Sequence, residues 1–223
     1  SLGERSAESY KALYDAGATR YLLRHEAANQ TLYEAIHTTD MSYSNRIGAI
    51  KNLMQIGYQT GMGMMIGIPG QTDDDIVDDL QLIATLRPQM VGIGPFIPHP
   101  ATPFGNFPAG DIDTTLNAVA ITRLLLPHAL IPATTALATL SADGHKLALG
   151  SGANVIMPNL SPADVRSKYA IYAGSTKKST KTLYIGVIDT KKNPVKTFEF
   201  DVPSYTTKVS ITSSKIVYWT EWA

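Results

Sequence analysis

A cationic and an anionic side chain, Arg24 and Glu26, stand two residues apart in the segment RYLLRHE, residues 20–26. This segment is a short apolar run of strand length, and side chains two residues apart on a strand point to the same face. A guanidinium and a carboxylate on one face can bind the two ends of a zwitterion such as an amino acid. The same two groups can instead pair with each other, and spacing alone favours this simpler interpretation.

Two further segments present polar groups where predicted strands end. Thr134 and Thr135 offer two hydroxyls and nearby backbone amides, which suit a carboxylate or a sulfate, although paired threonines are also common in strands. The segment GIPGQTDDD, residues 67–75, combines a tight turn with a helix start, so backbone amides could approach a ligand closely there. It lacks the lysine of a P-loop, and its three aspartates would repel phosphate, which argues against a nucleoside triphosphate.

The histidines show no metal-ligand spacing. His99 stands between two prolines in GPFIPHPATPF, where the rigid backbone favours a structural role over catalysis. His37, His128 and His145 fall in or beside predicted helices. The sequence contains no cysteine, which excludes disulfides, thiolate zinc sites and any iron–sulfur cluster held by its own cysteines. No metal site is therefore predicted.

The elements that position these groups alternate between helix and strand. Ser6 precedes a helix that ends near Gly17, and Thr72, followed by three aspartates, predicts the start of another. Strands that alternate with helices indicate a parallel sheet. The predicted strands are residues 20–26, 60–68, 90–93, 130–134 and 154–157, and the predicted helices are residues 6–17, 43–56, from 72 onward, 113–126 and 143–149.

About five parallel strands at spacings of roughly 25 to 40 residues predict an α/β fold, a partial (βα)8 TIM-like barrel, over residues 1–174. Composition changes after Gly174, because residues 175–223 hold eight lysines against four acidic residues and both tryptophans. Runs of β-forming residues predict a β-rich C-terminal extension over residues 175–223. These runs are residues 183–188, 196–202, 208–212 and 215–219.

Bulk composition narrows the expected partners. Nineteen basic residues balance nineteen acidic ones, so no overall field favours nucleic acid or an anionic membrane. The longest apolar stretches, near residues 62–69 and 90–98, are much shorter than the roughly 20 residues of a membrane span. No secretory signal opens the sequence. We expect a cytoplasmic protein, or an organellar one in a eukaryote.

Six segments in order carry a resemblance to a known family. They are SLGERS, RYLLRHEAAN, SNRIGAIKNLMQIGYQTGMGMMIGIPGQT, MVGIGPFIPHPATPF, RLLLPHALIPATTA and GANVIMPNLSP. Together they run from Ser1 to Pro162 and resemble the radical S-adenosylmethionine (SAM) maturase family HydE, which matures the active-site H-cluster of [FeFe]-hydrogenase. The resemblance implies a (βα)8 barrel in which a [4Fe-4S] cluster splits SAM into methionine and a 5′-deoxyadenosyl radical.

The resemblance implies a SAM site built from four residues of this sequence. Glu26 and Arg46 would hold the amino-acid end of SAM, because a carboxylate suits the ammonium and a guanidinium suits the carboxylate. Arg24 and Met157 would line the same cavity. The GIPGQT turn would lie beside the adenosine.

The resemblance also implies a substrate cavity. Thr134 and Thr135 match residues of an anion site deeper in the barrel, and Tyr169 and Tyr172 match tyrosines that face the substrate. The family acts on a sulfur-bearing, cysteine-derived iron precursor. The expected partners are therefore SAM, such a precursor and other hydrogenase maturases.

The sequence departs from the family in two ways. The cluster-binding CxxxCxxC motif is absent, and the resemblance implies a truncated maturase that begins after the third strand of the barrel. Residues 175–223 do not resemble the end of the family's chains. Without the cluster there is no electron donor for the sulfonium, so we expect this polypeptide to be inactive.

Two alternatives remain open at this point. Another radical SAM protein, similar to biotin synthase or methylornithine synthase, could share Glu26 and Arg46, although the GPFIPHP and PATTA segments favour HydE. The other alternative is a non-enzymatic binding protein that acts through its β-rich extension.

Overall fold

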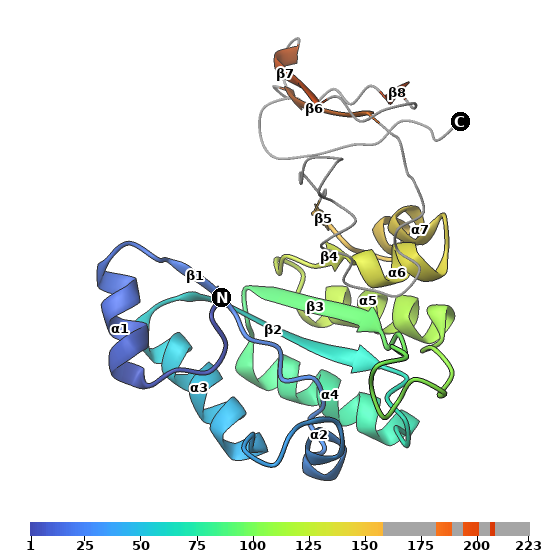
Figure 1. Cartoon of the computed structure of the whole chain (residues 1–223). Helices are drawn as coiled ribbons and strands as arrows, with labels where there is room; N and C mark the ends of the chain where they lie inside the picture. Colours follow the sequence, from blue (N-terminus) through green and yellow to red (C-terminus); the bar gives the residue numbers. More distant parts are fainter. Residues whose placement is uncertain (158–181, 189–193, 201–205, 208–223) are drawn as a thin grey trace. The chain divides into compact units, whose positions relative to one another are not determined.

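The computed structural model describes residues 1–157, 182–188, 194–200 and 206–207. The chain divides into two compact units, Ser1–Pro158 and Asn159–Ala223. In the first unit, strands and helices alternate along the chain, as Figure 1 shows. Its elements are α1 (Ala7–Asp15), β1 (Arg20–Leu22), α2 (Gln30–Ile36), α3 (Tyr43–Ile56), β2 (Gln59–Ile66), α4 (Asp73–Leu86), β3 (Met90–Pro95), α5 (Ile112–Leu125), β4 (Pro132–Ala133), α6 (Thr135–Leu140), α7 (Gly144–Gly150) and β5 (Val155–Ile156).

The strands of the first unit pair in parallel. β2 lies between β1 and β3, with Met64 of β2 opposite Ile93 of β3. β4 pairs with β5, and an isolated parallel bridge between Met90 and Leu130 joins β3 to the segment that precedes β4. Strand order therefore follows chain order, as in successive strands of a (βα) barrel. This arrangement confirms the predicted α/β fold with parallel strands and intervening helices.

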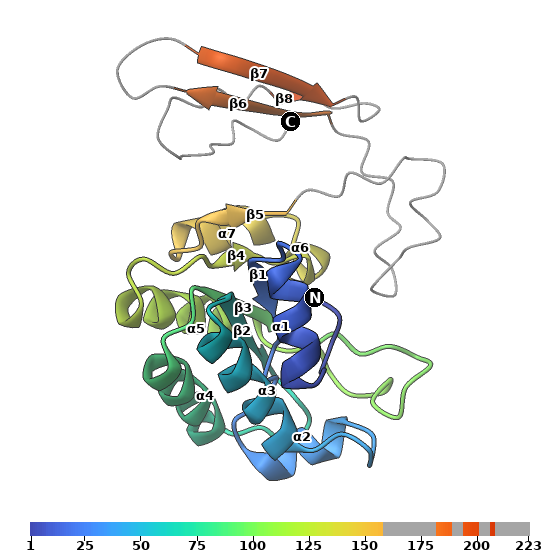
Figure 2. The same cartoon turned by 90° about the vertical axis from the view of Figure 1, so that its left-hand side faces the viewer.

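One face of the β1–β3 sheet packs against helices. Met62, Met64 and Ile66, which alternate along β2, are almost completely buried among residues of α1, α3, α4 and α5. Figure 2 shows α4 and α5 beside β2 and β3. The residues between them, Gly63 and Met65, face the other side of the sheet. On this second face of the sheet, β2 presents few large side chains.

Helices α1, α3 and α4 begin or end at their predicted capping residues. Oγ of Ser6 accepts a hydrogen bond from the Ser9 N–H at the start of α1. Thr72 and Asp75 form a reciprocal capping box at the start of α4, in which each side chain accepts a hydrogen bond from the other's backbone N–H. α3 ends at Gly57, whose φ of 104° lies in the left-handed region. These three predictions are confirmed.

Two short helices and one strand end differ from the sequence predictions. β1 covers three residues rather than 20–26, and Glu26 returns to the sheet only through an isolated bridge to Met64. α2 follows the N-cap Asn29, and α6 follows the N-cap Thr134, which was predicted to end a strand. Helices of 6 or 7 residues span too few turns to show a clear helical period in the sequence.

In the second unit the described residues form three strands, β6 (Thr182–Ile188), β7 (Pro194–Phe200) and β8 (Thr206–Thr207). β6 pairs antiparallel with β7 and parallel with β8. The predicted strands at residues 208–212 and 215–219 and the predicted boundary at residue 174 lie outside the described residues. A β-rich extension over residues 175–223 therefore stays a prediction.

Asp75 joins the start of α4 to the segment that follows β1. Its carboxylate accepts hydrogen bonds from the Thr72 N–H and from the Asn29 amide, each at 2.7 Å. We expect Asp75→Ala to lower the free energy of unfolding by about 1–2 kcal/mol, because the cap and the Asn29 contact are lost together. Urea denaturation at neutral pH measures this effect, with the exposed Asp74→Ala as the control.

The same carboxylate should make stability depend on pH. The hydrogen bonds from Thr72 lower the pKa of Asp75 below its ordinary value of 3.8. The ionised group therefore contributes stability above pH 3.8 that is lost as the pH falls through the lower pKa of the folded state. The stability difference between the wild type and Asp75→Asn should shrink over that range, and a constant difference would contradict the assignment.

Candidate functional site

Arg24 and Glu26 lie at the carboxyl end of β1. Nη2 of Arg24 is 3.1 Å from Oε2 of Glu26 and 2.6 Å from the carbonyl oxygen of Met64. The two side chains are 30% and 20% exposed, so the ion pair is largely covered. The two groups thus pair with each other, as the simpler interpretation of their spacing predicts.

Glu26 adopts a backbone conformation that is uncommon for residues other than glycine. Its φ is 68°, in the left-handed region. Its N–H donates a hydrogen bond to the Gly63 carbonyl, and its carbonyl accepts one from the Met65 N–H, both at 3.0 Å. β2 therefore holds this conformation from both sides. Strained residues held in this way concentrate at functional sites, which supports Glu26 as a site residue.

Arg46 brings a second guanidinium from α3 to the same strand end. Its Nε donates to Oε1 of Glu4 at 2.6 Å, and its Nη1 donates to the carbonyl oxygen of Arg24 at 2.5 Å. The guanidinium carbon lies 5.6 Å from the centre of the Tyr33 ring, within the range of a cation–π contact. Burial raises the pKa of Tyr33, so this phenol stays protonated beside the cation. Arg46 is 7% exposed, and its position is fixed by three separate elements.

Glycine on β2 leaves room for the Arg24 side chain. A Cβ atom on Gly63 would lie 2.3 Å from the Gly92 carbonyl oxygen and 2.9 Å from Cγ of Arg24. Both distances are shorter than a non-bonded contact allows. The Arg24 side chain therefore lies directly over the backbone of β2, a path that any larger residue at position 63 would block.

His25 lies between Arg24 and Glu26 in the sequence and points to the opposite face of the sheet. Its Nε2 is 3.0 Å from Oδ1 of Asp79 on α4, and the same oxygen accepts a hydrogen bond from the Ala28 N–H at 2.6 Å. Both side chains are fully buried. Burial raises the pKa of Asp79, and the hydrogen bond from His25 acts against this shift. The pair fixes the end of β1 to α4 and thereby positions Arg24 and Glu26.

The GIPGQT turn after β2 is closed by its own glutamine. Oε1 of Gln71 accepts a hydrogen bond from the Gly67 N–H at 2.6 Å, and Nε2 of Gln71 donates to the Met65 carbonyl at 2.9 Å. Gly67 has a φ of 84°, and a Cβ atom there would lie 2.3 Å from Cα of Gly110. The Gly67 amide, one of the groups expected to approach a ligand, is therefore engaged within the turn.

A pocket of about 230 Å³ opens where β1, β2 and β3 end. Ligands of parallel α/β sheets bind at the carboxyl ends of the strands, and mostly apolar pockets with a few polar groups are typical ligand sites. This pocket has both properties, so it is the candidate site. It is lined by Glu26, Ile36, His37, Met65, Phe96, Ile97, His99, Thr102 and Phe104.

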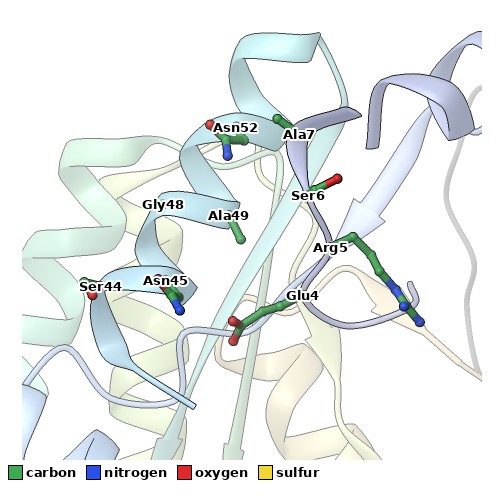
Figure 3. A pocket seen from close by; sticks show the side chains of 9 residues that line it. All are labelled: Glu4, Arg5, Ser6, Ala7, Ser44, Asn45, Gly48, Ala49 and Asn52. Carbon is green, nitrogen blue, oxygen red and sulfur yellow. The ribbon is translucent and has the colours of Figure 1, made fainter. Parts of the chain in front are cut away.

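A larger hollow of about 440 Å³ lies between the N-terminal segment and α3. Figure 3 shows Glu4, Arg5 and Ser6 on one side and Asn45, among other α3 residues, on the other. Its lining is polar or small and lacks the aromatic and large apolar side chains of the strand-end pocket. Because no strand residue lines it, we do not assign it a ligand. The hollow is related to the candidate site through Glu4, whose carboxylate accepts a hydrogen bond from Arg46.

Thr134 and Thr135 do not lie on a strand. Thr134 is the N-cap of α6, where its Oγ1 accepts a long hydrogen bond of 3.4 Å from the Leu137 N–H. Its Oγ1 lies 3.2 Å from the position that a Cβ atom on Gly94 would occupy, which places the hydroxyl beside β3. Thr135 is exposed and opens the helix, and its carbonyl accepts a hydrogen bond from the Thr139 hydroxyl. Their proposed role with anions stays a prediction.

No contact among the described residues places the other predicted site residues near the end of β1. Met157 directly follows β5 and is 48% exposed. Tyr169 and Tyr172 lie outside the described residues. Their assignment to the SAM and substrate cavities therefore rests on the resemblance alone.

Sequence reasoning missed Glu4, Tyr33 and His37. Glu4 and Tyr33 surround Arg46, and His37 lines the strand-end pocket. A local signal existed for one pair, since Tyr33 and His37 are four residues apart in a short amphipathic segment. No local signal relates Glu4 to Arg46, because the contact joins residues 42 positions apart.

Two features are absent from the described part of the chain. No group of three or more His, Cys, Asp or Glu residues is placed to hold a metal ion there. No helix in the same residues is long and apolar enough to cross a membrane.

Comparison with known sequences identifies several relatives. The chain is 51% identical over 174 residues to the [FeFe] hydrogenase maturase subunit HydE of Thermotoga maritima, a match that covers 78% of this chain and 50% of the relative. It is 33% identical over 157 residues to the biotin synthase of Crocosphaera subtropica, covering 70% of this chain and 40% of that protein. The chain thus spans about half the length or less of these curated relatives. No family model matches the sequence.

A solved structure has a similar fold. The crystal structure of methylornithine synthase (PylB) superposes with a TM-score of 0.63 and 26% sequence identity, over 70% of this chain and 45% of that chain. The matches to HydE and biotin synthase, together with this fold, confirm the resemblance inferred from the sequence.

Proposed function

The chain is a HydE-like relative of the radical SAM enzymes, and from this premise we propose that the site at the carboxyl end of β1 binds SAM. HydE, biotin synthase and methylornithine synthase are radical SAM enzymes that use SAM and a [4Fe-4S] cluster. This chain spans only part of each, so the activities of those proteins enter here as proposals.

The observation that carries the proposal is the convergence of Glu26 and Arg46 on one strand end. Nη1 of Arg46 donates a hydrogen bond to the backbone carbonyl of Arg24, which precedes Glu26 by two positions in the chain. This bond holds the Arg46 guanidinium against the same short segment that carries Glu26. A carboxylate and a guanidinium so placed match the ammonium and the carboxylate of an amino acid. The left-handed backbone conformation of Glu26 and the burial of the Arg46 side chain support a preorganised site.

The amino-acid end of SAM would bind by exchange of charged partners. Glu26 is paired with Arg24, and Arg46 is paired with Glu4. The SAM ammonium would replace Nη2 of Arg24 at Glu26, and the SAM carboxylate would replace Glu4 at Arg46. Arg24 would keep its hydrogen bond to the Met64 carbonyl. Glu26 and Arg46 would each exchange one partner for another of the same sign and so stay paired. The displaced groups, Arg24 and Glu4, have side chains that are 30% and 25% exposed and can reach water.

The residues of this chain do not fit a [4Fe-4S] cluster. Cysteine thiolates hold such clusters, and the 223 residues include no cysteine. The cluster supplies the electron that cleaves SAM in the relatives, so we propose that this polypeptide binds SAM without cleaving it.

We propose a role in H-cluster maturation on the basis of the HydE relationship. The substrate would be a cysteine-derived iron precursor, and other hydrogenase maturases would be the protein partners. Thr134, Thr135, Tyr169 and Tyr172 would face that substrate, with Arg24 and Met157 lining the cavity. A cytoplasmic location, or an organellar one in a eukaryote, accords with this role.

The biotin synthase-like alternative has weaker support. Identity to HydE is 51% over 174 residues, against 33% over 157 residues for biotin synthase. The alternative of a binding protein that acts through residues 175–223 concerns a region that is mostly outside the described residues, and no observation favours it.

Calorimetric titration of the full chain with SAM tests the proposed site. Glu26→Gln and Arg46→Gln should each weaken SAM binding by about 10- to 100-fold, because each removes a charge-assisted hydrogen bond. The matched controls are Glu34→Gln on α2 and Lys51→Gln on α3, which remove exposed charges of the same signs.

The controls should bind SAM as the wild type does. Circular dichroism on all five proteins establishes that the variants are folded. Equal affinity in the site variants and the controls, or no SAM binding by the wild type, would overturn the proposal.

A further inference from the structure

The loop between β3 and α5, residues 97–109, is closed at its base. The Gly110 N–H donates a hydrogen bond to the Phe96 carbonyl at 2.9 Å, and the Phe96 N–H donates one to the Ile66 carbonyl of β2 at 2.7 Å. Phe96 and Gly110 are both buried. A surface loop whose two ends meet in this way is an Ω-loop, a class that is frequently functional.

The β3–α5 loop is hydrogen-bonded to itself. The His99 carbonyl accepts hydrogen bonds from the Thr102 N–H and from the Thr102 hydroxyl, at 2.9 Å and 2.8 Å. The Thr102 carbonyl accepts one from the Gly105 N–H, and the Phe104 carbonyl accepts one from the Phe107 N–H, both at 3.1 Å. Its backbone is further restricted by prolines at positions 98, 100, 103 and 108. The loop therefore keeps its own shape.

The loop is attached to the rest of the protein only weakly. Among the residues that the structure describes, no hydrogen bond joins residues 97–109 to any other segment. The ring of Phe104 packs edge-to-face on Phe96 at the base, with centroids 6.5 Å apart. Most residues of the loop are exposed, including Phe107 at 46%. A segment that is ordered internally and has few contacts outside itself can move as one unit at low cost.

This loop forms one wall of the strand-end pocket. His99, Thr102 and Phe104 line the pocket from the loop, and Ile36 and His37 line it from the end of α2. The wall on α2 is held in place, because Nδ1 of His37 donates a hydrogen bond to a main-chain carbonyl of its own helix at 2.6 Å. One wall of the pocket is thus fixed, and the other is attached only at its base.

We propose that residues 97–109 are a lid that closes over the strand-end pocket when a ligand occupies it. This inference rests on the proposed SAM site and adds a conformational step to it. Phe96 and Gly110 would stay bonded, and the loop would turn about its connections to them, Ile97 and Ala109. Movement toward α2 narrows the pocket and excludes water from the ligand. Contacts between the ligand and the loop favour the closed state.

Two cysteines introduced into this cysteine-free chain test the movement. Ala101→Cys lies on the loop and Ala35→Cys lies on α2, and both positions are exposed. Nitroxide labels on the two cysteines report their separation by pulsed electron paramagnetic resonance. Saturating SAM should shorten this separation by about 2 Å or more, as in complexes whose loops rearrange on binding. The control pair, Ala35→Cys with Lys51→Cys on α3, lies outside the loop and should show no change.

A change inside the loop tests its effect on the ligand. A Cβ atom on Gly105 would lie 2.9 Å from Cα of Pro100 and 3.0 Å from the His99 carbonyl oxygen. Gly105→Ala should shift the midpoint of thermal unfolding by less than about 2 °C, because the loop is attached only at its base. It should speed SAM dissociation, measured by surface plasmon resonance, by about fivefold or more. Gly48→Ala, where a Cβ atom meets nothing within 4 Å, should leave the dissociation rate unchanged.

The outcomes separate the lid from the SAM site. Calorimetric titration of the labelled proteins gives the SAM concentration that saturates them. An unchanged separation between residues 35 and 101 at that concentration would overturn the lid and leave the SAM site in place. An unchanged dissociation rate in Gly105→Ala would do the same. Failure of the wild type to bind SAM would overturn both the proposed function and this inference.

Discussion

Replacing Asp79 by alanine should lower the free energy of unfolding by about 3–5 kcal/mol. Oδ1 of Asp79 accepts hydrogen bonds from Nε2 of His25 and from the Ala28 N–H, at 3.0 Å and 2.6 Å. Both Asp79 and His25 are fully buried, so the His25 ring would gain no water in the variant. An unsatisfied buried donor costs roughly 1–3 kcal/mol, and this substitution removes the acceptor of the buried His25 ring and of the partly buried Ala28 N–H while opening a cavity.

Urea denaturation of the full chain, followed by circular dichroism, measures the effect of Asp79→Ala. Asp78→Ala is the matched control, because Asp78 is the preceding residue of α4 and is exposed. Its stability should stay within about 0.5 kcal/mol of the wild type. Similar losses in the two variants would show that the His25–Asp79 pair does not hold the strand end.

The same substitution should also weaken SAM binding under conditions where the variant is folded. Asp79 fixes the end of β1 through His25, and Arg24 and Glu26 flank His25 in the chain. A site held less precisely binds its ligand less tightly. Titration with SAM at low temperature checks this expectation, and unchanged affinity would restrict Asp79 to a role in stability.

Gly110→Ala should be as damaging as the loss of Asp79, at about 3 kcal/mol or more. A Cβ atom on Gly110 would lie 2.0 Å from the Ile66 carbonyl oxygen and 2.9 Å from the Phe96 backbone nitrogen. Both contacts are with backbone, which cannot move aside as a flexible side chain can. The Phe96 N–H donates to the same Ile66 carbonyl, and the Gly110 N–H donates to the Phe96 carbonyl. The methyl group would therefore separate the ends of β2 and β3 beside the pocket.

Gly48→Ala is the control for the glycine substitution. Gly48 lies within α3, and a Cβ atom there meets nothing within 4 Å, so the change should raise stability by about 0.5–1 kcal/mol. Denaturation curves of both variants give the comparison. If Gly110→Ala is insoluble, limited proteolysis of freshly refolded protein distinguishes it from the wild type. A Gly110→Ala protein as stable as the wild type would contradict the close approach of the two chain segments.

The fold and part of the site could be predicted because their signals are local. Ser6, Thr72 and Gly57 mark helix ends by chemistry that acts within one turn, and each does so in the structure. Alternation along the predicted strand 20–26 also places Arg24 and Glu26 on one face, and they form an ion pair although β1 itself ends at Leu22. The resemblance to HydE could be predicted because its segments recur in order, and 51% identity over 174 residues confirms that resemblance.

Predictions failed where distant residues decide the outcome. α6 was missed because Thr134 is compatible both with a strand and with a helix cap, and local propensity does not separate the two. The contacts of Arg46 with Glu4 and with the Arg24 carbonyl join three segments that have no common local pattern. His37 showed no ligand spacing because the other histidine that lines the pocket, His99, is 62 positions away in the chain.

By itself, the sequence determined the α/β alternation, the helix caps, the relationship to HydE and the charged pair Arg24 and Glu26. Only the tertiary structure decided three further points. Arg46 contacts this segment through the Arg24 carbonyl, and Asp79 binds His25 on the opposite face of the sheet. His37 and His99 line one pocket. The physical reason is the range of the interactions. Capping and strand alternation act between residues a few positions apart, whereas a site at the end of a parallel sheet is assembled only when separate strands align their carboxyl ends.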